Sequence, residues 1–165
     1  MRSISATMFV TLDGVVQGFG RPDEDTRGGF PHGGWGAAYG DEVLGAETGN
    51  GMAQGGAMLF GRRTWQDFLG VWACADDGNP FTAHMNAARK YVVSGSLTST
   101  DARENSELLR SLDDVGALAG DLSVAGGAAL LGGPAPRTEF DLTGTVTTPK
   151  GVVVAHYTRV SPGAR

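Results

Sequence analysis

The 165-residue chain is predicted to fold as a single α/β domain over residues 1–165, with a mostly parallel central sheet flanked by helices and an antiparallel C-terminal hairpin. Two observations predict this class. Short apolar runs typical of strands alternate with segments of helical spacing. The last part of the chain instead holds two strand-like stretches around a turn, so we expect an antiparallel edge.

Strand-like segments in the first four-fifths of the chain carry the predicted parallel sheet. The first alternates apolar with small or polar residues from Ile4 to Leu12 and ends at Asp13-Gly14. The others are short apolar runs, as expected for strands buried on both faces. They span residues 57–60, 90–94 and 121–125, with another short one near 106–109.

The hairpin is predicted from Phe140 to Tyr157. Its turn, Thr148-Pro149-Lys150-Gly151, has proline and glycine at the positions that a β-turn favours. Alternation along the first strand places three apolar side chains on one face, namely Phe140, Leu142 and Val146. These apolar strands are the surface on which a second copy of the chain could pack.

Helical patterns fill the intervals between the strands. The segment 41–54 opens with acidic residues, which suits a helix dipole, and segments 113–119 and 128–131 are shorter candidates. Asn79-Pro80 is a good helix start, with an N-cap followed by proline. A stripe at i, i+3, i+4 and i+7 gives another helix one apolar face: Trp65, Phe68, Leu69 and Trp72. Side chains in such a stripe are more often part of the hydrophobic core than in contact with a cofactor.

Composition narrows the classes of partner. The formal net charge of −5 argues against nucleic acid, which needs a broad basic surface. Cys74 is the only cysteine, so no intrachain disulfide can form, and this fits a reducing compartment. Neither a signal peptide nor a membrane-spanning run is evident, so we expect a cytoplasmic protein. No zinc-ligand spacing, phosphate-binding Walker loop or nucleophile elbow occurs, so no metal site is predicted.

Three strand ends indicate one ligand. In an open α/β sheet, ligands lie outside the carboxyl ends of the strands. Paired glycines let the backbone approach a pyrophosphate at a helix start, arginines can clamp phosphates, and hydroxyl groups suit a ribose or a phosphate edge. A 2′-phosphate neutralised by arginine would favour NADPH over NADH. The candidate cofactor-binding residues are Gly61, Arg62, Arg63, Thr64, Ser94, Gly95, Ser96, Gly126, Gly127 and Ala128.

Each of these segments also has an ordinary structural interpretation. A Gly-Gly pair after a strand is commonly a tight turn, an Arg-Arg pair at a helix start is commonly a solvated surface pair, and Ser94-Gly95-Ser96 can be a plain loop. The argument for a cofactor therefore depends on all three lying at equivalent strand ends.

Two further features bear on a substrate. The long stretch from Gly18 to Gly36 contains His32 and Trp35, which could form a lid or substrate wall, unless this loop is merely floppy. Asp13 ends an apolar strand, where partial shielding from water could raise its pKa and let it manage a proton. Asp13 could equally be part of a turn-forming Asp-Gly pair.

Several motifs resemble those of one family. They are Thr11-Leu12-Asp13-Gly14, Pro22-Asp23-Glu24-Asp25, His32-Gly33-Gly34-Trp35, Leu59-Phe60-Gly61-Arg62-Arg63-Thr64-Trp65, Lys90-Tyr91-Val92-Val93-Ser94 and Val124-Ala125-Gly126-Gly127. The family is the dihydrofolate-reductase-like bacterial group related to the reductase domain of bifunctional riboflavin biosynthesis enzymes. The resemblance covers most of residues 4–131 and 137–158.

The resemblance implies a dihydrofolate-reductase-like fold and an enzyme that uses NADPH to reduce a small heterocyclic or carbonyl substrate, similar to a pterin or a riboflavin precursor. It also implies a homodimer. Arg62, Arg63 and Thr64 would hold cofactor phosphates, and Ser94 with its neighbours would lie near the adenosine ribose. Asp13 would lie at the nicotinamide and substrate end. The alternatives are a non-catalytic nucleotide- or ligand-binding module on the same fold, or a purely structural domain.

The chain departs from the family pattern after Leu131. The family continues through a further helix and strand, on the order of 20 to 30 residues with connections. Here the chain passes through Gly132-Gly133-Pro134 toward the hairpin. Either the protein has truly lost this helix and strand, or residues have been left out of the sequence near 131–134. We favour the second, because a sheet that lacks an interior strand would expose unpaired backbone groups.

Overall fold

The computed structural model describes residues 4–53, 56–72, 75, 77–118, 122–125 and 139–160. The chain divides into two compact units. The first unit contains Met1–Val10 and Gly51–Gly127, and the second contains Thr11–Asn50 and Ala128–Arg165. Among the described residues, each unit has its own sheet. The single domain predicted over 1–165 stays a prediction.

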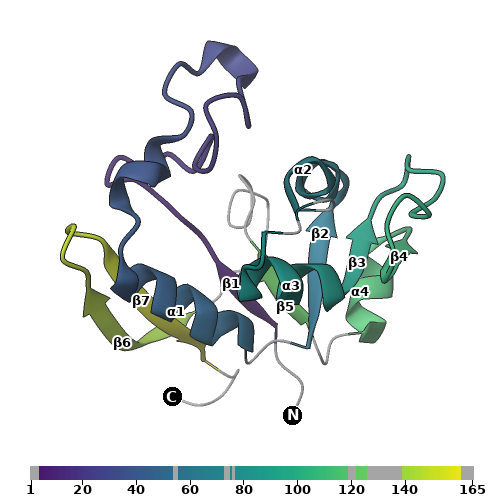
Figure 1. Cartoon of the computed structure of the whole chain (residues 1–165). Coiled ribbons are helices and arrows are strands. Elements are labelled where there is room, and N and C mark those ends of the chain that lie inside the picture. The colour runs from purple at the N-terminus through teal and green to yellow at the C-terminus, as the bar shows by residue number, and fades with distance from the viewer. Residues whose placement is uncertain are drawn as a thin grey trace. The chain divides into compact units, whose positions relative to one another are not determined.

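The first unit is built on a five-stranded sheet in which every described pair of strands is parallel. The strand order is β1-β5-β2-β3-β4 (Figure 1). Because the strands are parallel, their carboxyl ends all lie at one edge of the sheet. The predicted parallel sheet is confirmed. The strands are β1 (Ser5–Thr7), β2 (Ala57–Gly61), β3 (Arg89–Val93), β4 (Ser106–Leu109) and β5 (Leu122–Ala125).

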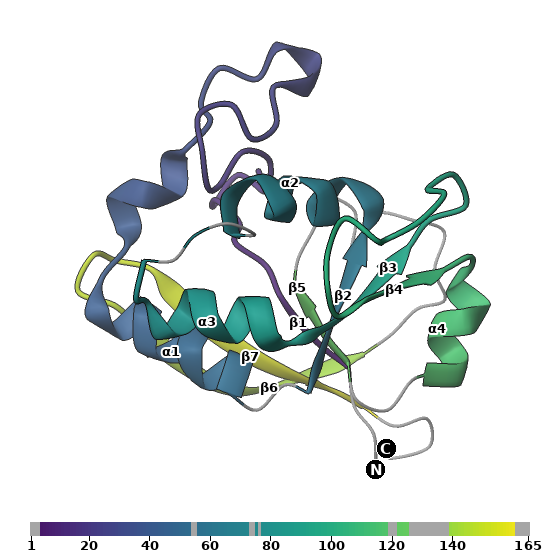
Figure 2. The same cartoon turned by 45° about the vertical axis from the view of Figure 1, so that its right-hand side comes forward.

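Helices cover both faces of this sheet. Helices α2 (Arg62–Trp72) and α3 (Pro80–Ala87) contact each other and lie side by side in Figure 2. Their apolar side chains pack with alternate residues of β2 and β3 in one cluster: Met58, Phe60, Trp65, Phe68, Met85 and Val92. Helix α4 (Leu112–Leu118) adds Val115 to a second cluster with the intervening strand residues. The alternation of the strands thus places a core on each face.

Local sequence signals set the helix positions. The Asn79 side-chain oxygen accepts a hydrogen bond of 2.9 Å from the backbone N–H of Phe81, and Pro80 begins α3, as predicted. Trp65 is only 2% exposed, and its indole N–H donates to Ser106 Oγ at 3.2 Å. The prediction that this tryptophan belongs to the core is confirmed.

The second unit contains the loop after residue 10, most of helix α1 (Glu42–Ala53) and the C-terminal hairpin. Strands β6 (Phe140–Thr147) and β7 (Val153–Arg159) are antiparallel and form a separate two-stranded sheet. The hairpin is confirmed, although in the described residues it is not the edge of the parallel sheet.

Helix α1 and the hairpin are tied together at two points. Asp41 caps α1 by accepting from Leu44 N–H at 2.8 Å, and its other carboxylate oxygen accepts from the backbone N–H of Lys150 at 3.3 Å. Further along, His156 Nε2 of β7 lies 3.2 Å from Glu47 Oε2. The turn before β7 closes as predicted, with Gly151 N–H donating to the Thr148 carbonyl at 2.9 Å.

The first strand is shorter than its sequence pattern predicted. Its pairing with β5 runs from Ser5↔Ser123 to Thr7↔Ala125, and β1 ends there rather than at Leu12. The side chain of Leu12 is fully exposed, at 112%. Alternation therefore predicts where a strand can form, whereas the hydrogen-bonded neighbour decides how far it extends.

A β-bulge changes which apolar side chains share a face of the hairpin. The register moves from Leu142↔Tyr157 to Gly144↔His156, so two residues of β6 oppose one of β7. Because neighbouring residues of β7 point to opposite faces, Leu142 and Val146 also end on opposite faces. The predicted single face through these two residues is wrong, because alternation assumes an uninterrupted strand.

Other predicted features lie outside the described residues: Cys74, the helical start at 128–131, and the junction at 131–134. Among the residues that the structure does describe, no helix combines the length and apolarity needed to cross a bilayer.

Candidate functional site

Two of the three predicted strand ends lie next to each other. Strands β2 and β3 are paired through Gly61↔Val93, so the chain leaves both strands at the same edge. At that edge Arg62 Nη1 donates a hydrogen bond of 2.9 Å to Ser96 Oγ. Arginine and serine residues that are far apart in sequence are thus brought together at the carboxyl edge, where α/β sheets bind ligands.

The strand-to-helix junction after β2 has no loop. Strand β2 ends at Gly61 and helix α2 begins at Arg62, so Arg62, Arg63 and Thr64 form its first turn. Figure 1 shows α2 at the carboxyl end of β2. The first N–H groups of a helix have no acceptor within the helix, and the helix dipole makes this end positive. All three side chains are exposed, so the turn can present both N–H groups and guanidinium groups to an anion.

The turn after β3 is held by Ser94. Its hydroxyl oxygen accepts from Ser96 N–H at 3.2 Å and from Leu97 N–H at 3.0 Å, and the residue is 8% exposed. Ser96, in contrast, is exposed and carries the hydroxyl that Arg62 contacts. The geometry therefore separates the roles of the two serines. Ser94 shapes the turn, whereas the Ser96 hydroxyl is exposed and contacts Arg62.

Two glycines border open space at this edge. A Cβ built on Gly61 or on Gly95 would have no neighbouring heavy atom within 4 Å, other than those adjacent in the chain or in its own helix. Glycine at these points leaves the backbone accessible to a bulky group. This is the kind of clearance that a nucleotide needs beside the arginine turn.

The third strand end is only partly described. Strand β5 pairs with β2 in parallel through Leu59↔Val124, so β5 also ends at this edge. Gly126, Gly127 and Ala128 follow β5 in the sequence but lie outside the described residues. Their contact with a pyrophosphate stays a prediction.

Arg110 is a residue of this edge that the sequence interpretation missed. It follows β4 directly, and its guanidinium donates to the Leu97 carbonyl at 2.6 Å and to the Thr98 carbonyl at 3.5 Å. The rule that identified the other strand ends would have found it, because Arg110 and Ser111 follow β4 directly in the sequence.

The backbone of Arg110 is anchored by the start of α4. The Asp114 carboxylate accepts from the N–H groups of Arg110 and Ser111, both at 2.9 Å. The Ser111 hydroxyl in turn accepts from Asp114 N–H at 3.3 Å, which completes a capping box. These bonds, that from Ser111 N–H first, lower the pKa of Asp114.

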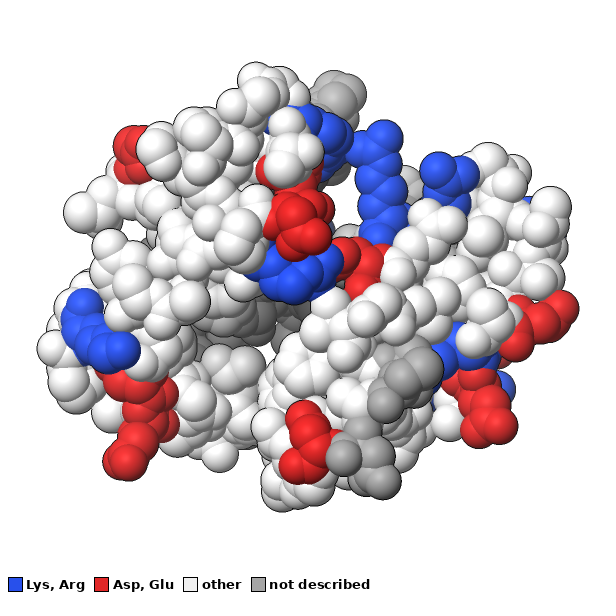
Figure 3. Space-filling model, turned by 45° about the horizontal axis from the view of Figure 1, so that its top comes forward, with Lys and Arg blue, Asp and Glu red and all other residues white. Residues whose placement is uncertain are grey.

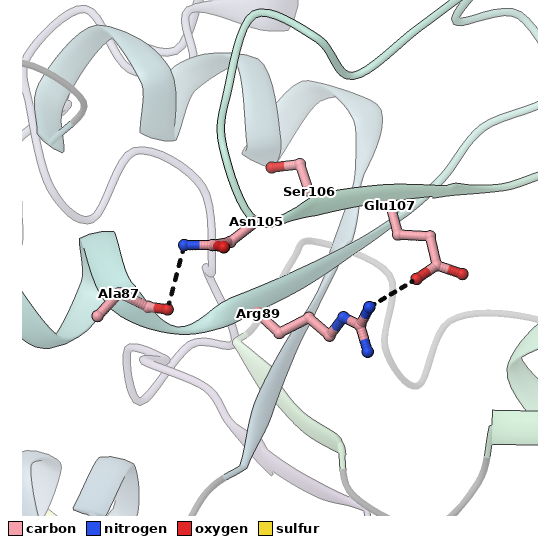
Figure 4. A pocket seen from close by; sticks show the side chains of 5 residues that line it. All are labelled: Ala87, Arg89, Asn105, Ser106 and Glu107. Atoms are coloured by element: carbon pink, nitrogen blue, oxygen red, sulfur yellow. Dashed lines mark hydrogen bonds and ion pairs between the residues drawn. The ribbon is translucent and has the colours of Figure 1, made fainter.

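Charged side chains of both signs are interspersed on the face drawn in Figure 3. A separate hollow of about 410 Å³ lies at the amino ends of β3 and β4, lined by Ala87, Arg89, Asn105, Ser106 and Glu107 (Figure 4). Arg89 is paired there with Glu107 at 3.5 Å. The arginine of this hollow thus already has a carboxylate partner. The hollow also lies at the amino edge of the sheet, opposite to the edge where α/β sheets bind cofactor phosphates. We therefore place the candidate site at the carboxyl edge.

Asp13 lies in the second unit and does not have the expected environment. Its carboxylate is exposed and accepts a short hydrogen bond from Thr11 Oγ1. That bond, followed by one from the backbone N–H of Asp13 itself, lowers the pKa of the carboxyl group. The expected raised pKa is wrong, because hydrogen bonding outweighs the small loss of hydration. The turn-forming interpretation is confirmed: Gly14 N–H donates to the Thr11 carbonyl at 2.9 Å, with φ of +88° at Gly14.

The predicted substrate loop is held by specific contacts. The Trp35 indole N–H donates to the Gln17 carbonyl at 2.9 Å, and its ring meets Phe19 edge-on at 5.2 Å. A Cβ on Gly36 would lie 2.2 Å from the Phe19 ring. Gln17 Nε2 also donates to the carbonyl of Asp25 at 3.0 Å. These contacts connect the beginning of the loop to its middle and its end.

The two aromatic candidates of this loop differ in their surroundings. Trp35 is half-buried and serves the loop itself, whereas His32 is exposed and lies edge-on to Phe30 at 5.8 Å. Contact of either with a substrate stays a prediction. Within the described ranges, no group of three His, Cys, Asp or Glu side chains is placed to hold a metal.

The architecture is that of an α/β protein with a parallel sheet, helices on its faces and a terminal antiparallel hairpin. No family model and no curated protein matches the chain. Solved structures do match, among them that of a provisionally assigned riboflavin biosynthesis protein from Shewanella sp. PV-4. The TM-score is 0.57 at 16% identity, over 98% of this chain and all of the other. Similarity at this level shows the fold.

Proposed function

We propose that this chain is an NADPH-dependent reductase of a small heterocyclic or carbonyl molecule similar to a pterin or a riboflavin precursor. The observation that carries the proposal is the hydrogen bond from Arg62 to Ser96, which joins two strand ends at the carboxyl edge of the parallel sheet. The similarity in fold to a provisionally assigned riboflavin biosynthesis protein is in keeping with a substrate similar to a riboflavin precursor.

The described residues fit the phosphorylated end of NADPH. Arg62 and Arg63 supply two guanidinium groups, and Thr64 adds a hydroxyl in the first turn of α2. The open space beside Gly61 and Gly95 gives the nucleotide room to approach the backbone. Charge-assisted bonds from arginine to phosphate are the strong, directional ones that could discriminate a 2′-phosphate.

When bound, NADPH supplies a hydride, and the protein binds and orients the two reactants. The reduction also consumes a proton. We assign Asp13 to the delivery of this proton. Its ionised carboxylate would accept a hydrogen bond from the substrate or pass a proton from water to it. His32 and Trp35 are the proposed substrate-side residues, with the exposed imidazole of His32 as the direct contact.

A cytoplasmic homodimer is part of the same proposal. Leu142 and Tyr157 face each other across the hairpin and are 55% and 61% exposed. Phe140 and Val153 are similarly exposed on the same sheet, at 50% and 63%. Apolar side chains grouped in this way favour contact with a second copy over exposure to water.

The alternative is a non-catalytic module that binds a nucleotide or a related ligand on the same fold. One observation favours it: Asp13 is exposed and its pKa is lowered, so its carboxyl group is not poised to donate a proton at neutral pH.

The test is a titration of the full chain with NADPH and with NADH, followed by tryptophan fluorescence. We expect NADPH to bind more tightly than NADH. Arg62→Ala should lower the ratio of the two affinities at least about tenfold, since a charge-assisted bond contributes about 1.5–3 kcal/mol. Arg89→Ala is the matched control, because Arg89 pairs with Glu107 at the opposite edge. Absence of NADPH binding would refute both the reductase and the nucleotide-binding alternative. Binding without oxidation by any pterin, flavin precursor or carbonyl compound would favour the alternative.

A further inference from the structure

Arg110 holds the turn that carries Ser96. Its guanidinium bridges two consecutive backbone carbonyls, those of Leu97 at 2.6 Å and Thr98 at 3.5 Å. Arg62 contacts the same turn from the other side, through Ser96 Oγ at 2.9 Å. Two arginines from β-strand ends on either side of β3 therefore hold one short turn between them.

The backbone of Arg110 is itself held in place by hydrogen bonds. The Asp114 carboxylate receives the backbone N–H groups of Arg110 and Ser111, and this fixes the chain where β4 passes into α4. The other side of the turn is fixed by Ser94, whose N–H donates to the Leu109 carbonyl at 2.9 Å. Between these anchors, Leu97 packs against the core cluster. The Arg110 guanidinium therefore links the end of β4 to this turn.

Carbonyl acceptors do not neutralise a guanidinium. The positive charge of Arg110 is thus retained beside Ser96, with two of its N–H groups directed at the backbone. A phosphate bound by Arg62 and Ser96 would gain from a turn already held in place, since less ordering is then needed on binding.

We propose that Arg110 is a positioning residue for the 2′-phosphate of NADPH, acting through the turn 94–98. The proposal rests on the proposed function. It assigns Arg110 to the selection of NADPH over NADH, because NADH lacks the group that Ser96 and Arg62 would meet.

The experiment compares the affinities of the full-length Arg110→Met variant for NADPH, NADH and adenosine 2′,5′-bisphosphate. We expect the dissociation constants for NADPH and the bisphosphate to rise about tenfold, which is about 1.4 kcal/mol, while that for NADH stays within about twofold. Arg110→Lys should recover part of the loss, since an ammonium can reach one carbonyl but not bridge two. Arg89→Met is the control of equal charge and should change none of the three constants.

The possible outcomes distinguish the role of Arg110 from the proposed function. An equal loss for NADPH and NADH would show that Arg110 is merely structural. An unchanged NADPH constant in Arg110→Met, in a wild-type protein that binds NADPH, would overturn the positioning role and leave the proposed function intact. A wild-type protein that binds neither cofactor would refute both. Should Arg110→Met not fold, Arg110→Lys is used with amide hydrogen exchange. Faster exchange at Ser96 and Leu97 with unchanged α4 supports the proposal, and unchanged exchange refutes it.

Discussion

Lys90 makes the free energy of unfolding depend on pH in a defined way. Its side chain is fully buried, at 0% exposure, on the face of β3 covered by α2 and α3. The ammonium donates to the carbonyls of Ala88 at 2.7 Å and Asn86 at 3.2 Å and lies 5.8 Å from the centre of the Phe68 ring. Burial, and secondly the charge of Arg103, lowers its pKa from 10.5 to about 8.

The sign of the effect follows from this depressed pKa. Between pH 8 and about 10.5 the unfolded chain binds a proton that the folded protein has released, so the free energy of unfolding rises with pH in that window. Below pH 8 both states are charged, and the full penalty of burying the ammonium remains. Each pH unit between the two pKa values is about 1.4 kcal/mol, so the gain from pH 7 to pH 10.5 is on the order of 3 kcal/mol.

The assay is urea unfolding of the wild type and Lys90→Met across pH 7 to 10.5, with tryptophan fluorescence as the signal. The informative quantity is the difference between the two free energies of unfolding, in which other titrating groups cancel. The change of this difference with pH carries the information. Its value at a single pH is less useful, because methionine removes the buried charge but also leaves two carbonyls without their hydrogen-bond donor.

The sequence contains one other lysine, Lys150, which is exposed in the hairpin turn and provides the control. Lys150→Met should show no such pH dependence. A wild-type minus Lys90→Met difference that stays flat from pH 7 to 10.5 would refute the reasoning. With only two lysines, ¹³C labelling of the side chains also allows each pKa to be read directly by NMR, even if Lys90→Met does not fold.

Two further predictions concern the second unit. Gly36→Ala should destabilise the loop by about 1–3 kcal/mol, seen as faster amide exchange there, because its Cβ would lie 2.2 Å from the Phe19 ring. Gly40→Ala, whose nearest such contact is 3.9 Å away, is the control, and equal exchange in both variants would contradict the expectation. Leu142→Glu should dissociate the proposed homodimer in sedimentation velocity, since it puts a charge on the exposed face of the hairpin. Leu112→Glu, at a 77% exposed position of α4, should leave the dimer intact, and a dimer that survives Leu142→Glu would exclude this face as the interface.

Much of the fold is determined by the sequence read locally. Apolar runs, helical stripes and the Asn79 N-cap depend on residues within a few positions of each other, and the structure has strands and helices where they predict them. The meeting of Arg62 with Ser96 was also predictable, because carboxyl ends of adjacent parallel strands necessarily share one edge.

Other features were decided by tertiary structure alone. Strand β1 pairs with β5 only from Ser5 to Thr7, and the bulge after Leu142 divides the apolar face of the hairpin. The burial of Lys90 and the bridge made by Arg110 depend on neighbours that are distant in sequence. Local propensity carries no information about such partners, because pairing, register and burial are free energies of contact between segments that meet only when the chain has folded.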